Sequence, residues 1–151
     1  MHISSIKRSI NALKSEKEAV ESLGMKYQRF YFIDHISPII KDNAEVDEFI
    51  NFVRGLPENA WLHFHCAAGK GRTSSFMIMY HMLMHPELSL DEIIDYQAKF
   101  GGLDFHKFSK AWKQESYSER VNFFKKFKKY IDAEDGYNAN IAWAKWQTAH
   151  P

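Results

Sequence analysis

The chain has 151 residues, a formal net charge of +1, 45% hydrophobic residues and a single cysteine. This length and apolar content predict one folded domain over residues 1–151 with its own core. The near-zero charge argues against nucleic-acid binding by bulk electrostatics, and a lone cysteine excludes an internal disulfide. No apolar run reaches the roughly 18 residues that a membrane span needs, and the first ten residues lack the apolar core of a signal peptide.

The first forty residues carry signals for a short helix, a strand and a loop. Ser15 and Glu18 form a capping-box pattern, which favours a helix that begins there and ends at Gly24. Residues 26–33 are rich in aromatic residues, a composition typical of a β-strand. Residues 34–38 read Asp-His-Ile-Ser-Pro and predict a loop that ends this strand.

A helix and a second strand are expected next. Asp42 or Asn43 would cap the helix, and the Gly-Leu-Pro segment at residues 55–57 would end it. Residues 60–65 predict a short strand that leads into Cys66. The helix has an apolar stripe with the spacing i, i+3, i+4, i+7. Its members are Val46, Phe49, Ile50 and Val53.

The remaining segments have helical patterns. Pro86 is expected to end the helix that follows Cys66. A second capping box, formed by Ser89 and Glu92, opens another helix, which the Gly-Gly pair at residues 101–102 closes.

The C-terminal part predicts one long and one short helix. Ser116 and Glu119 repeat the capping-box pattern and predict the start of the long helix, which Gly136 ends. The short helix carries Trp143 and Trp146. The long helix is expected to face the core with Val121, Phe124, Phe127 and Ile131.

Residues 26–85 together predict an α/β fold. Their order is strand, helix, strand, loop, helix, which favours a short parallel sheet flanked by helices. Ligands of such sheets bind beyond the carboxyl ends of the strands. Asp34 and Cys66 both fall at these ends.

The pattern His-Cys-x5-Arg-Thr at residues 65–73 is the strongest functional signal. Five residues between Cys66 and Arg72 can curl so that their backbone N–H groups converge on an anion. We expect this phosphate loop to consist of Ala67, Ala68, Gly69, Lys70 and Gly71, with both glycines adopting backbone angles that side chains forbid.

Each chemical need of phosphate-ester hydrolysis has a candidate side chain in this motif. Arg72 offers a planar fork for two phosphate oxygens. A helix N-terminus and nearby cations would lower the pKa of Cys66 and leave a thiolate nucleophile. The Thr73 hydroxyl could stabilise that sulfur as a leaving group, His65 would orient the loop, and Lys70 could bind a second phosphate or remain a solvated lysine.

Asp34 is a candidate general acid. An alcohol leaves a phosphate monoester poorly unless its bridging oxygen is protonated, and a carboxylic acid on a loop at a neighbouring strand end could supply that proton. The alternative is a turn residue that ends the strand. His35 could contact substrate phosphate or cap the same turn.

Other interpretations of these residues are weaker. Cys66 could be an ordinary buried cysteine. A Walker-type nucleotide loop does not fit, because Lys70 is followed by Gly71 rather than by Ser or Thr. His81 and His85 have an i, i+4 spacing that metal sites use, but Met82 stands where a metalloprotease has glutamate, so we expect no metal and no cofactor.

The chain resembles the protein tyrosine phosphatase-like phytases, a bacterial family of cysteine phosphatases that act on inositol phosphates. The resemblance is carried by residues 61–73, Trp-Leu-His-Phe-His-Cys-x-x-Gly-x-Gly-Arg-Thr, and by Asp34-His35-x-x-Pro38. It extends from residues 22–27 through Gln97 to the tryptophan-bearing C-terminus, which closes with His-Pro.

The resemblance implies a phosphatase core reduced at its N-terminus and metal-independent hydrolysis. It also implies Cys66 as nucleophile, Arg72 as phosphate clamp, Asp34 as general acid and His35 as substrate contact. The expected partner is a small polyanionic inositol phosphate. The alternatives are a dual-specificity protein or phosphoinositide phosphatase and, from another class, a non-catalytic phosphate-binding module.

Overall fold

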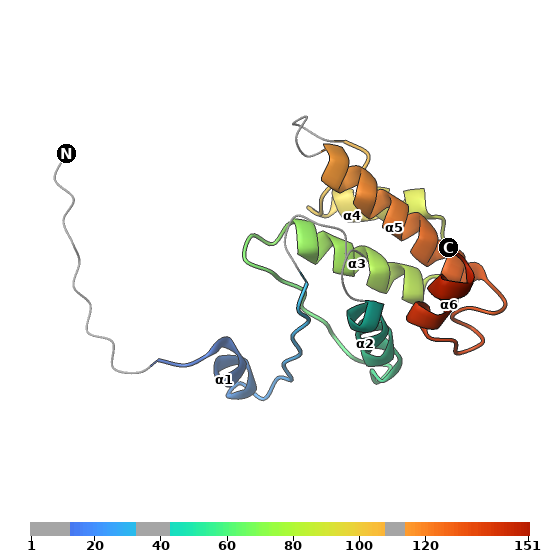
Figure 1. Ribbon diagram of the computed structural model, residues 1–151. Coiled ribbons are helices and arrows are strands. Elements are labelled where there is room, and N and C mark those ends of the chain that lie inside the picture. The colour runs from blue at the N-terminus through green and yellow to red at the C-terminus, as the bar shows by residue number, and fades with distance from the viewer. Residues whose placement is uncertain (1–12, 33–42, 108–113) are drawn as a thin grey trace, which may run out of the picture. The chain divides into compact units, whose positions relative to one another are not determined.

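The computed structural model of the protein describes residues 13–32, 43–107 and 114–151. The chain separates into two compact units, residues 1–30 and 31–151. Within the described residues the secondary structure is helical, and Figure 1 shows the helices in chain order. None of the described helices is both long enough and apolar enough to cross a bilayer.

The described part of the first unit contains one helix, α1 (Glu16–Glu21). The Ser15 hydroxyl accepts the Glu18 N–H at 3.2 Å, and the Glu18 carboxylate accepts the Ser15 N–H at 2.7 Å. This is the predicted capping box, formed in both directions. Gly24 follows at φ +77°, as a glycine that ends a helix often does.

Helix α2 (Asn43–Arg54) has the apolar stripe that its sequence predicts. Val46, Phe49, Ile50 and Val53 are all buried. Asn43 is already the first helical residue and Asp42 lies outside the described residues, so the expected cap is not shown.

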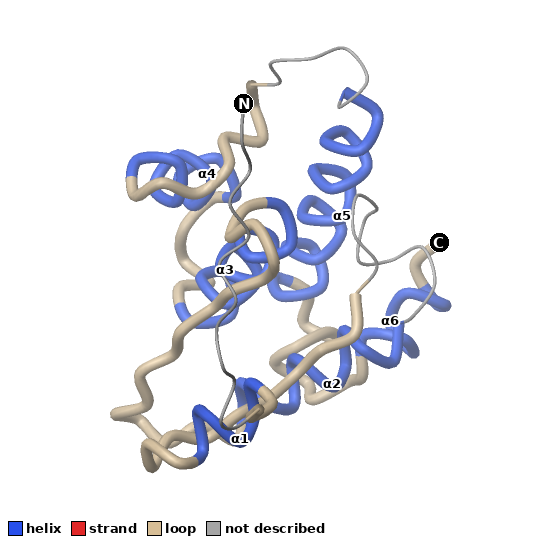
Figure 2. Tube along the Cα trace, turned by 90° about the vertical axis from the view of Figure 1, so that its left-hand side faces the viewer, coloured by secondary structure: helices blue, strands red, loops and turns tan. Residues whose placement is uncertain are grey.

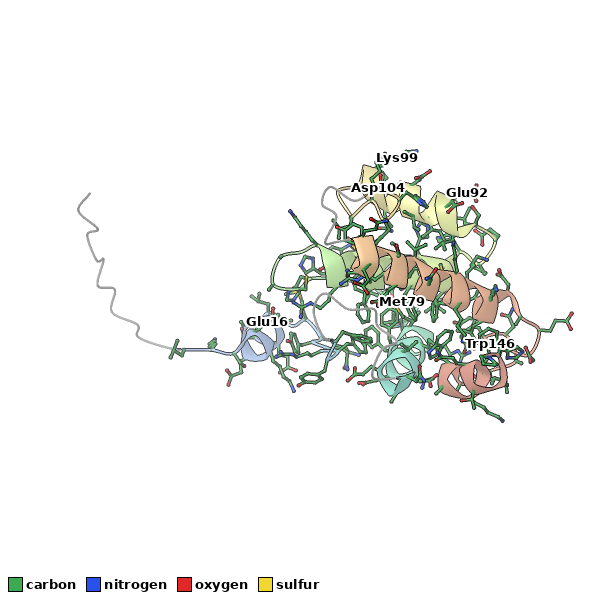
Figure 3. All side chains as sticks on the ribbon, turned by 45° about the horizontal axis from the view of Figure 1, so that its top comes forward. Glu16, Met79, Glu92, Lys99, Asp104 and Trp146 are labelled. Atoms are coloured by element: carbon green, nitrogen blue, oxygen red, sulfur yellow. The ribbon has the colours of Figure 1, made fainter. Side chains whose placement is uncertain are left out.

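Helix α3 (Gly71–Met84) lies at the centre of the second unit and packs against both α4 (Leu90–Lys99) and α5 (Gln114–Asp132). Figure 3 shows Met79 of α3 within this core, where it is fully buried. Helix α4 begins at the predicted capping box, because Ser89 and Glu92 bond each other's backbone N–H. Its polar side, which carries Glu92 and Lys99, faces outward.

The prediction that Ser116 caps the long helix is wrong. Helix α5 already includes Gln114, so Ser116 lies inside it. The S-x-x-E spacing also places both side chains one turn apart within a helix, and sequence cannot separate the two cases. Of the predicted core positions on α5, Phe124, Phe127 and Ile131 are buried, and Val121 is only half-buried.

Helix α6 (Trp143–Ala149) takes its N-terminal cap from another helix. Its own N-cap position holds Ala142, which has no side-chain acceptor. The Asp47 carboxylate of α2 accepts the N–H groups of Trp143 and Ala144 at 2.6 and 3.0 Å. The Asn43 side chain accepts the Trp143 indole N–H at 3.1 Å. These bonds fasten the C-terminal helix to α2.

The predicted parallel sheet is absent from the described residues (Figure 2). Residues 60–66 are extended, and their side chains alternate between half-buried and exposed, as those of a strand would. A strand also needs a neighbouring backbone for its ladder of hydrogen bonds. Residues 60–65, and the described part of 26–33, have no such ladder and are loops.

Candidate functional site: the loop from Cys66 to Arg72

The extended segment before Cys66 is held by aromatic packing on one face. Phe64 points inward, with ring centroids 6.5 Å from Phe49 and 5.7 Å from Tyr80. On the opposite face the rings of Trp61, His63 and His65 stack in succession at 6.1 and 5.7 Å. The structure thus places His65 on the exposed side of the segment, next to Cys66 in sequence.

The phosphate loop turns at Gly69 and enters α3 at Gly71. Gly69 has φ +62°, a conformation that favours glycine, as the sequence predicts. Lys70 occupies the N-cap position of α3, and its carbonyl accepts the Ser74 N–H at 2.7 Å. Residues 67–70 are exposed, so the loop is open to a ligand.

Hydrogen-bond donors surround the Cys66 sulfur. The Thr73 hydroxyl donates to Cys66 Sγ at 3.1 Å, which is the bond that the sequence predicts. Burial raises the pKa of the Cys66 thiol, but this hydrogen bond and those from the backbone N–H groups of Thr73, Ala68 and Lys70 outweigh it and lower the pKa to about 6. Cys66 is therefore mostly a thiolate at neutral pH.

These donors correct one expectation. The sequence predicts that the helix N-terminus and nearby cations together lower the pKa of Cys66. The principal lowering interactions are hydrogen bonds from the Thr73 hydroxyl and from backbone N–H groups at and before the helix N-terminus, and they come from neutral groups. Donors from residues 68, 70 and 73 converge on one point, which is the geometry of an anion-binding nest. The same donors stabilise the negative charge of the Cys66 thiolate.

Three consecutive hydroxyl residues at the start of α3 are buried, and each has a separate bond. Thr73 donates to Cys66 Sγ. Ser74 Oγ accepts the Leu103 N–H at 2.9 Å, which ties the loop after α4 to this turn. Ser75 Oγ donates to the Gly71 carbonyl at 2.9 Å and secures the first turn of α3. This division of roles accounts for a polar Thr-Ser-Ser run in a buried position.

Arg72 is the second residue of α3 and is half-buried. It lies at the helix N-terminus, where backbone N–H groups and the helix dipole favour a bound anion. Arg72 therefore stands at the end of the loop that begins at Cys66, where a bound anion is favoured.

Sequence reasoning missed one residue beside the loop, Arg120 of α5. It is only 3% exposed, and its guanidinium lies against Gly71. The helical phase could have revealed it, because Arg120 shares a stripe with the buried residues Tyr117, Phe124 and Phe127. An arginine within an apolar stripe indicates a specific contact.

Two predicted site residues are not placed by the structure. Asp34 and His35 lie outside the described residues. The segment immediately before them is anchored: the Phe32 ring packs on Phe76 of α3 with centroids 4.7 Å apart, and the Tyr31 N–H donates to Glu45 of α2 at 3.2 Å. The chain therefore reaches residue 32 at a fixed point on α3.

A cavity elsewhere is not part of this site. It has a volume of about 290 Å³ and lies along the first turns of α5, and no phosphate-loop residue lines it. His81, one of the two histidines whose spacing resembles that of metal sites, belongs to α3 and faces α4. Its Nδ1 lies 3.3 Å from Nε2 of Gln97 on α4.

Comparison with known proteins identifies the family. The family profile of the PTP-like phytases, described as inositol hexakisphosphate, matches residues 2–84, more than half of the chain. The chain belongs to the PTP-like phytase family. These phytases are cysteine-dependent phosphatases, and the fold of the described residues is theirs.

Solved phytases match the chain closely. A PTP-like myo-inositol phosphatase from Mitsuokella multacida, in complex with myo-inositol-(1,3,4,5)-tetrakisphosphate, has a TM-score of 0.79 and 35% identity over 91% of this chain and 24% of its own. A PTP-like phytase from Bdellovibrio bacteriovorus has a TM-score of 0.78 and 33% identity over 95% of this chain and 56% of its own.

A curated relative is a bacterial effector protein. Effector protein hopD2 of Pseudomonas syringae pv. tomato is 30% identical over 141 residues, which cover 89% of this chain and 29% of hopD2. The chain thus spans less than a third of hopD2 and about a quarter of the Mitsuokella phosphatase.

Proposed function

We propose that this chain hydrolyses phosphate monoesters of inositol polyphosphates through a phosphocysteine intermediate on Cys66, without a metal ion. One observation carries the proposal: hydrogen bonds from the phosphate loop and Thr73 lower the pKa of Cys66 to about 6. A thiolate within an anion-binding nest is suited to attack a phosphate ester and has no need of a separate general base.

In the first step the Cys66 sulfur attacks phosphorus, an S–P bond forms and the bond from phosphorus to the inositol oxygen breaks. Arg72 and the loop N–H groups hold the phosphoryl oxygens, where negative charge is spread in the transition state. Asp34 gives its proton to the departing oxygen. In the second step water attacks phosphorus, Asp34 takes a proton from that water, and the sulfur leaves as a thiolate that Thr73 stabilises.

The role of Asp34 is supported by the anchored segment before it. Phe32 packs on Phe76, and Asp34 follows two residues later, a reach of about 7 Å for an extended chain. The Asp34→Asn variant should lose about 10²–10⁴-fold in turnover of alkyl phosphates. It should lose far less on aryl phosphates, whose leaving groups depart as anions. Equal losses on both types would assign Asp34 a structural role.

The substrate class rests on the family and on one relative. The family description is inositol hexakisphosphate, and the Mitsuokella phosphatase binds an inositol tetrakisphosphate. Lys70 is exposed on the loop and is available to a phosphate beside the scissile one. His35, next to the proposed general acid Asp34, would contact the same substrate.

One observation favours a second candidate, a dual-specificity protein or phosphoinositide phosphatase. Residues 67–70 are exposed, and an open loop admits a peptide side chain or a lipid headgroup as readily as an inositol ring. The binding-module alternative lacks such support, since a non-catalytic site needs no thiolate.

A parallel phosphate-release assay tests the proposal. Inositol hexakisphosphate, a phosphotyrosine peptide and a phosphoinositide are supplied separately, with and without EDTA, and Cys66→Ser serves as the blank. We expect the fastest release from inositol hexakisphosphate and no effect of EDTA. Faster release from the peptide or the lipid would replace the phytase assignment, and binding without release would leave the non-catalytic module.

A further inference from the structure

Gly71, where the phosphate loop becomes α3, is not a glycine for the reason that the sequence suggests. Positive φ angles in the described glycines occur at Gly24, Gly69 and Gly101, so the backbone angle of Gly71 suits any residue. A Cβ atom at Gly71 would instead lie 2.6 Å from Arg120 Nη1 and 3.3 Å from Nη2. Position 71 is a glycine because a guanidinium occupies the space that a side chain would need.

The core fixes the position of this guanidinium. Arg120 is 3% exposed and projects from α5, which packs along α3. Its neighbours on α5, Tyr117 one turn earlier and Phe123 and Phe124 one turn later, are buried as well. Because the side chain is buried, a shift of the guanidinium away from Gly71 has to displace other core atoms.

The guanidinium lies at the point where the phosphate loop enters α3. It approaches the backbone of Gly71, the first residue of that helix. The N–H groups of Ala68 and Lys70, just before this point, converge on the Cys66 sulfur. A planar guanidinium buried beside Gly71 therefore limits how far the end of the loop can shift away from the sulfur.

We propose that Arg120 is a positioning residue that braces the phosphate loop from behind, at Gly71, and so keeps the loop N–H groups converged on the Cys66 sulfur. Gly71 and Arg120 work as one unit: the glycine admits the guanidinium, and the guanidinium holds the loop. The consequence for catalysis rests on the proposed function, but the consequence for the Cys66 thiol does not.

The test uses the full chain, whose single cysteine makes thiol titration specific for Cys66. The rate of alkylation by iodoacetamide is measured against pH for the wild type, Arg120→Met, Arg120→Lys and Gly71→Ala. We expect Arg120→Met and Gly71→Ala each to raise the midpoint by about one pKa unit, a tenfold loss of thiolate below the midpoint. Arg120→Lys keeps the charge without the planar fork and should titrate between Arg120→Met and the wild type.

The double variant Gly71→Ala/Arg120→Met shows whether the two single substitutions disturb Cys66 through one shared contact or independently. With the guanidinium gone, a methyl group at position 71 has room, so the double variant should titrate like Arg120→Met alone, a clear departure from additivity. Phe127→Leu, a buried change on the same helix, is the control: its melting temperature should fall while its midpoint stays at the wild-type value.

Two results would overturn the assignment. In the first, Arg120→Met has a lower melting temperature but titrates Cys66 at the wild-type midpoint, which marks a purely structural arginine. In the second, the midpoint shift of the double variant equals the sum of the shifts of Gly71→Ala and Arg120→Met. Should Arg120→Met fail to fold, Gly71→Ala and Arg120→Lys decide the matter. If the wild type releases phosphate from no substrate while the midpoints shift as expected, the proposed function fails and the brace stands.

Discussion

The phosphate loop and the aromatic cluster of α5 and α6 differ in what holds each in place. The loop is exposed at residues 67–70 and is shaped by hydrogen bonds around one sulfur. In the cluster the fully buried Trp143 has the rings of Phe127, Tyr130 and Trp146 at centroid distances of 5.6, 5.5 and 6.0 Å. Figure 3 places Trp146 at α6, in the part of the second unit formed by α2 and α6.

The comparison separates stability from chemistry. Buried aromatic area accounts for most of the free energy of folding in such a cluster, and its loss is felt throughout the fold. The hydrogen bonds of the loop contribute less to folding but set the pKa of one thiol. Changes in the cluster should therefore alter the free energy of unfolding, and changes in the loop should alter the Cys66 pKa and turnover.

The largest effect should come from Cys66→Ser. The serine hydroxyl is far less ionised than the thiol, so turnover should fall below detection, by more than about 10³-fold. The loop N–H groups and Arg72 remain, so inorganic phosphate should still bind in a calorimetric titration. Turnover within tenfold of the wild type would remove Cys66 from the chemistry.

Next in size is the loss of a cluster residue. Trp143→Ala should lower the free energy of unfolding by about 3–5 kcal/mol, measured by urea denaturation, because it opens a cavity and leaves the Asn43 side chain without its indole donor. Trp61→Ala is the matched control, since Trp61 is 80% exposed and should change stability by less than about 0.5 kcal/mol. If the folded fraction of Trp143→Ala titrates Cys66 at a different pH from the wild type, the cluster affects the chemistry of the loop and the two regions are not independent.

A smaller change is expected from Thr73→Val, which keeps the shape of the side chain and removes the hydroxyl donor. A hydrogen bond to a charged group contributes about 1.5–3 kcal/mol, so the pKa of Cys66 should rise by about one to two units. Thiolate absorbance near 240 nm across pH measures it, and Thr73→Ser should stay near the wild type. An unchanged midpoint in Thr73→Val would show that the backbone donors alone set the pKa.

The same lowered pKa links stability to pH. Because the folded thiol releases its proton near pH 6 and an unfolded cysteine near pH ~8.5, the folded state binds fewer protons between these values. Stability from Cys66 is therefore complete above pH ~8.5 and is lost as the pH falls through 6. The urea concentration at which half of the protein is unfolded should therefore rise from pH 5.5 to pH 8.5 by more in the wild type than in Cys66→Ser.

The smallest effect concerns substrate choice. Lys70→Met should raise KM for inositol hexakisphosphate up to about fivefold, as expected for an exposed ion pair of about 0.2–1 kcal/mol, and should scarcely affect a small aryl phosphate. Added salt should weaken the binding of inositol hexakisphosphate more than that of the small aryl phosphate. Lys129→Met, a lysine on α5, is the control. Equal KM changes on both substrates would place Lys70 at the scissile phosphate.

Local signals predicted much of this molecule. The capping boxes at Ser15 and Ser89 and the stripe of α2 depend on residues within one or two turns, and they formed as expected. The Thr73 bond to Cys66 was also predictable, since both residues belong to one loop-helix motif.

Features that depend on distant residues were not predictable in this way. The sequence predicts a strand over residues 60–65, but a sheet requires a partner backbone that local sequence does not specify. The cap of α6 comes from Asp47 of α2, and the need for glycine at position 71 comes from Arg120 of α5. In these last two cases a side chain of another helix, brought near by packing, determines what the local sequence needs.

The most direct test of the account is to trap the intermediate. The chain is mixed with 32P-labelled inositol hexakisphosphate, quenched in acid during turnover, and digested so that the labelled peptide can be identified. We predict one labelled peptide, the one containing Cys66, with the label absent from Cys66→Ser. Steady turnover with no label on Cys66, or label on another residue, would contradict the phosphocysteine mechanism.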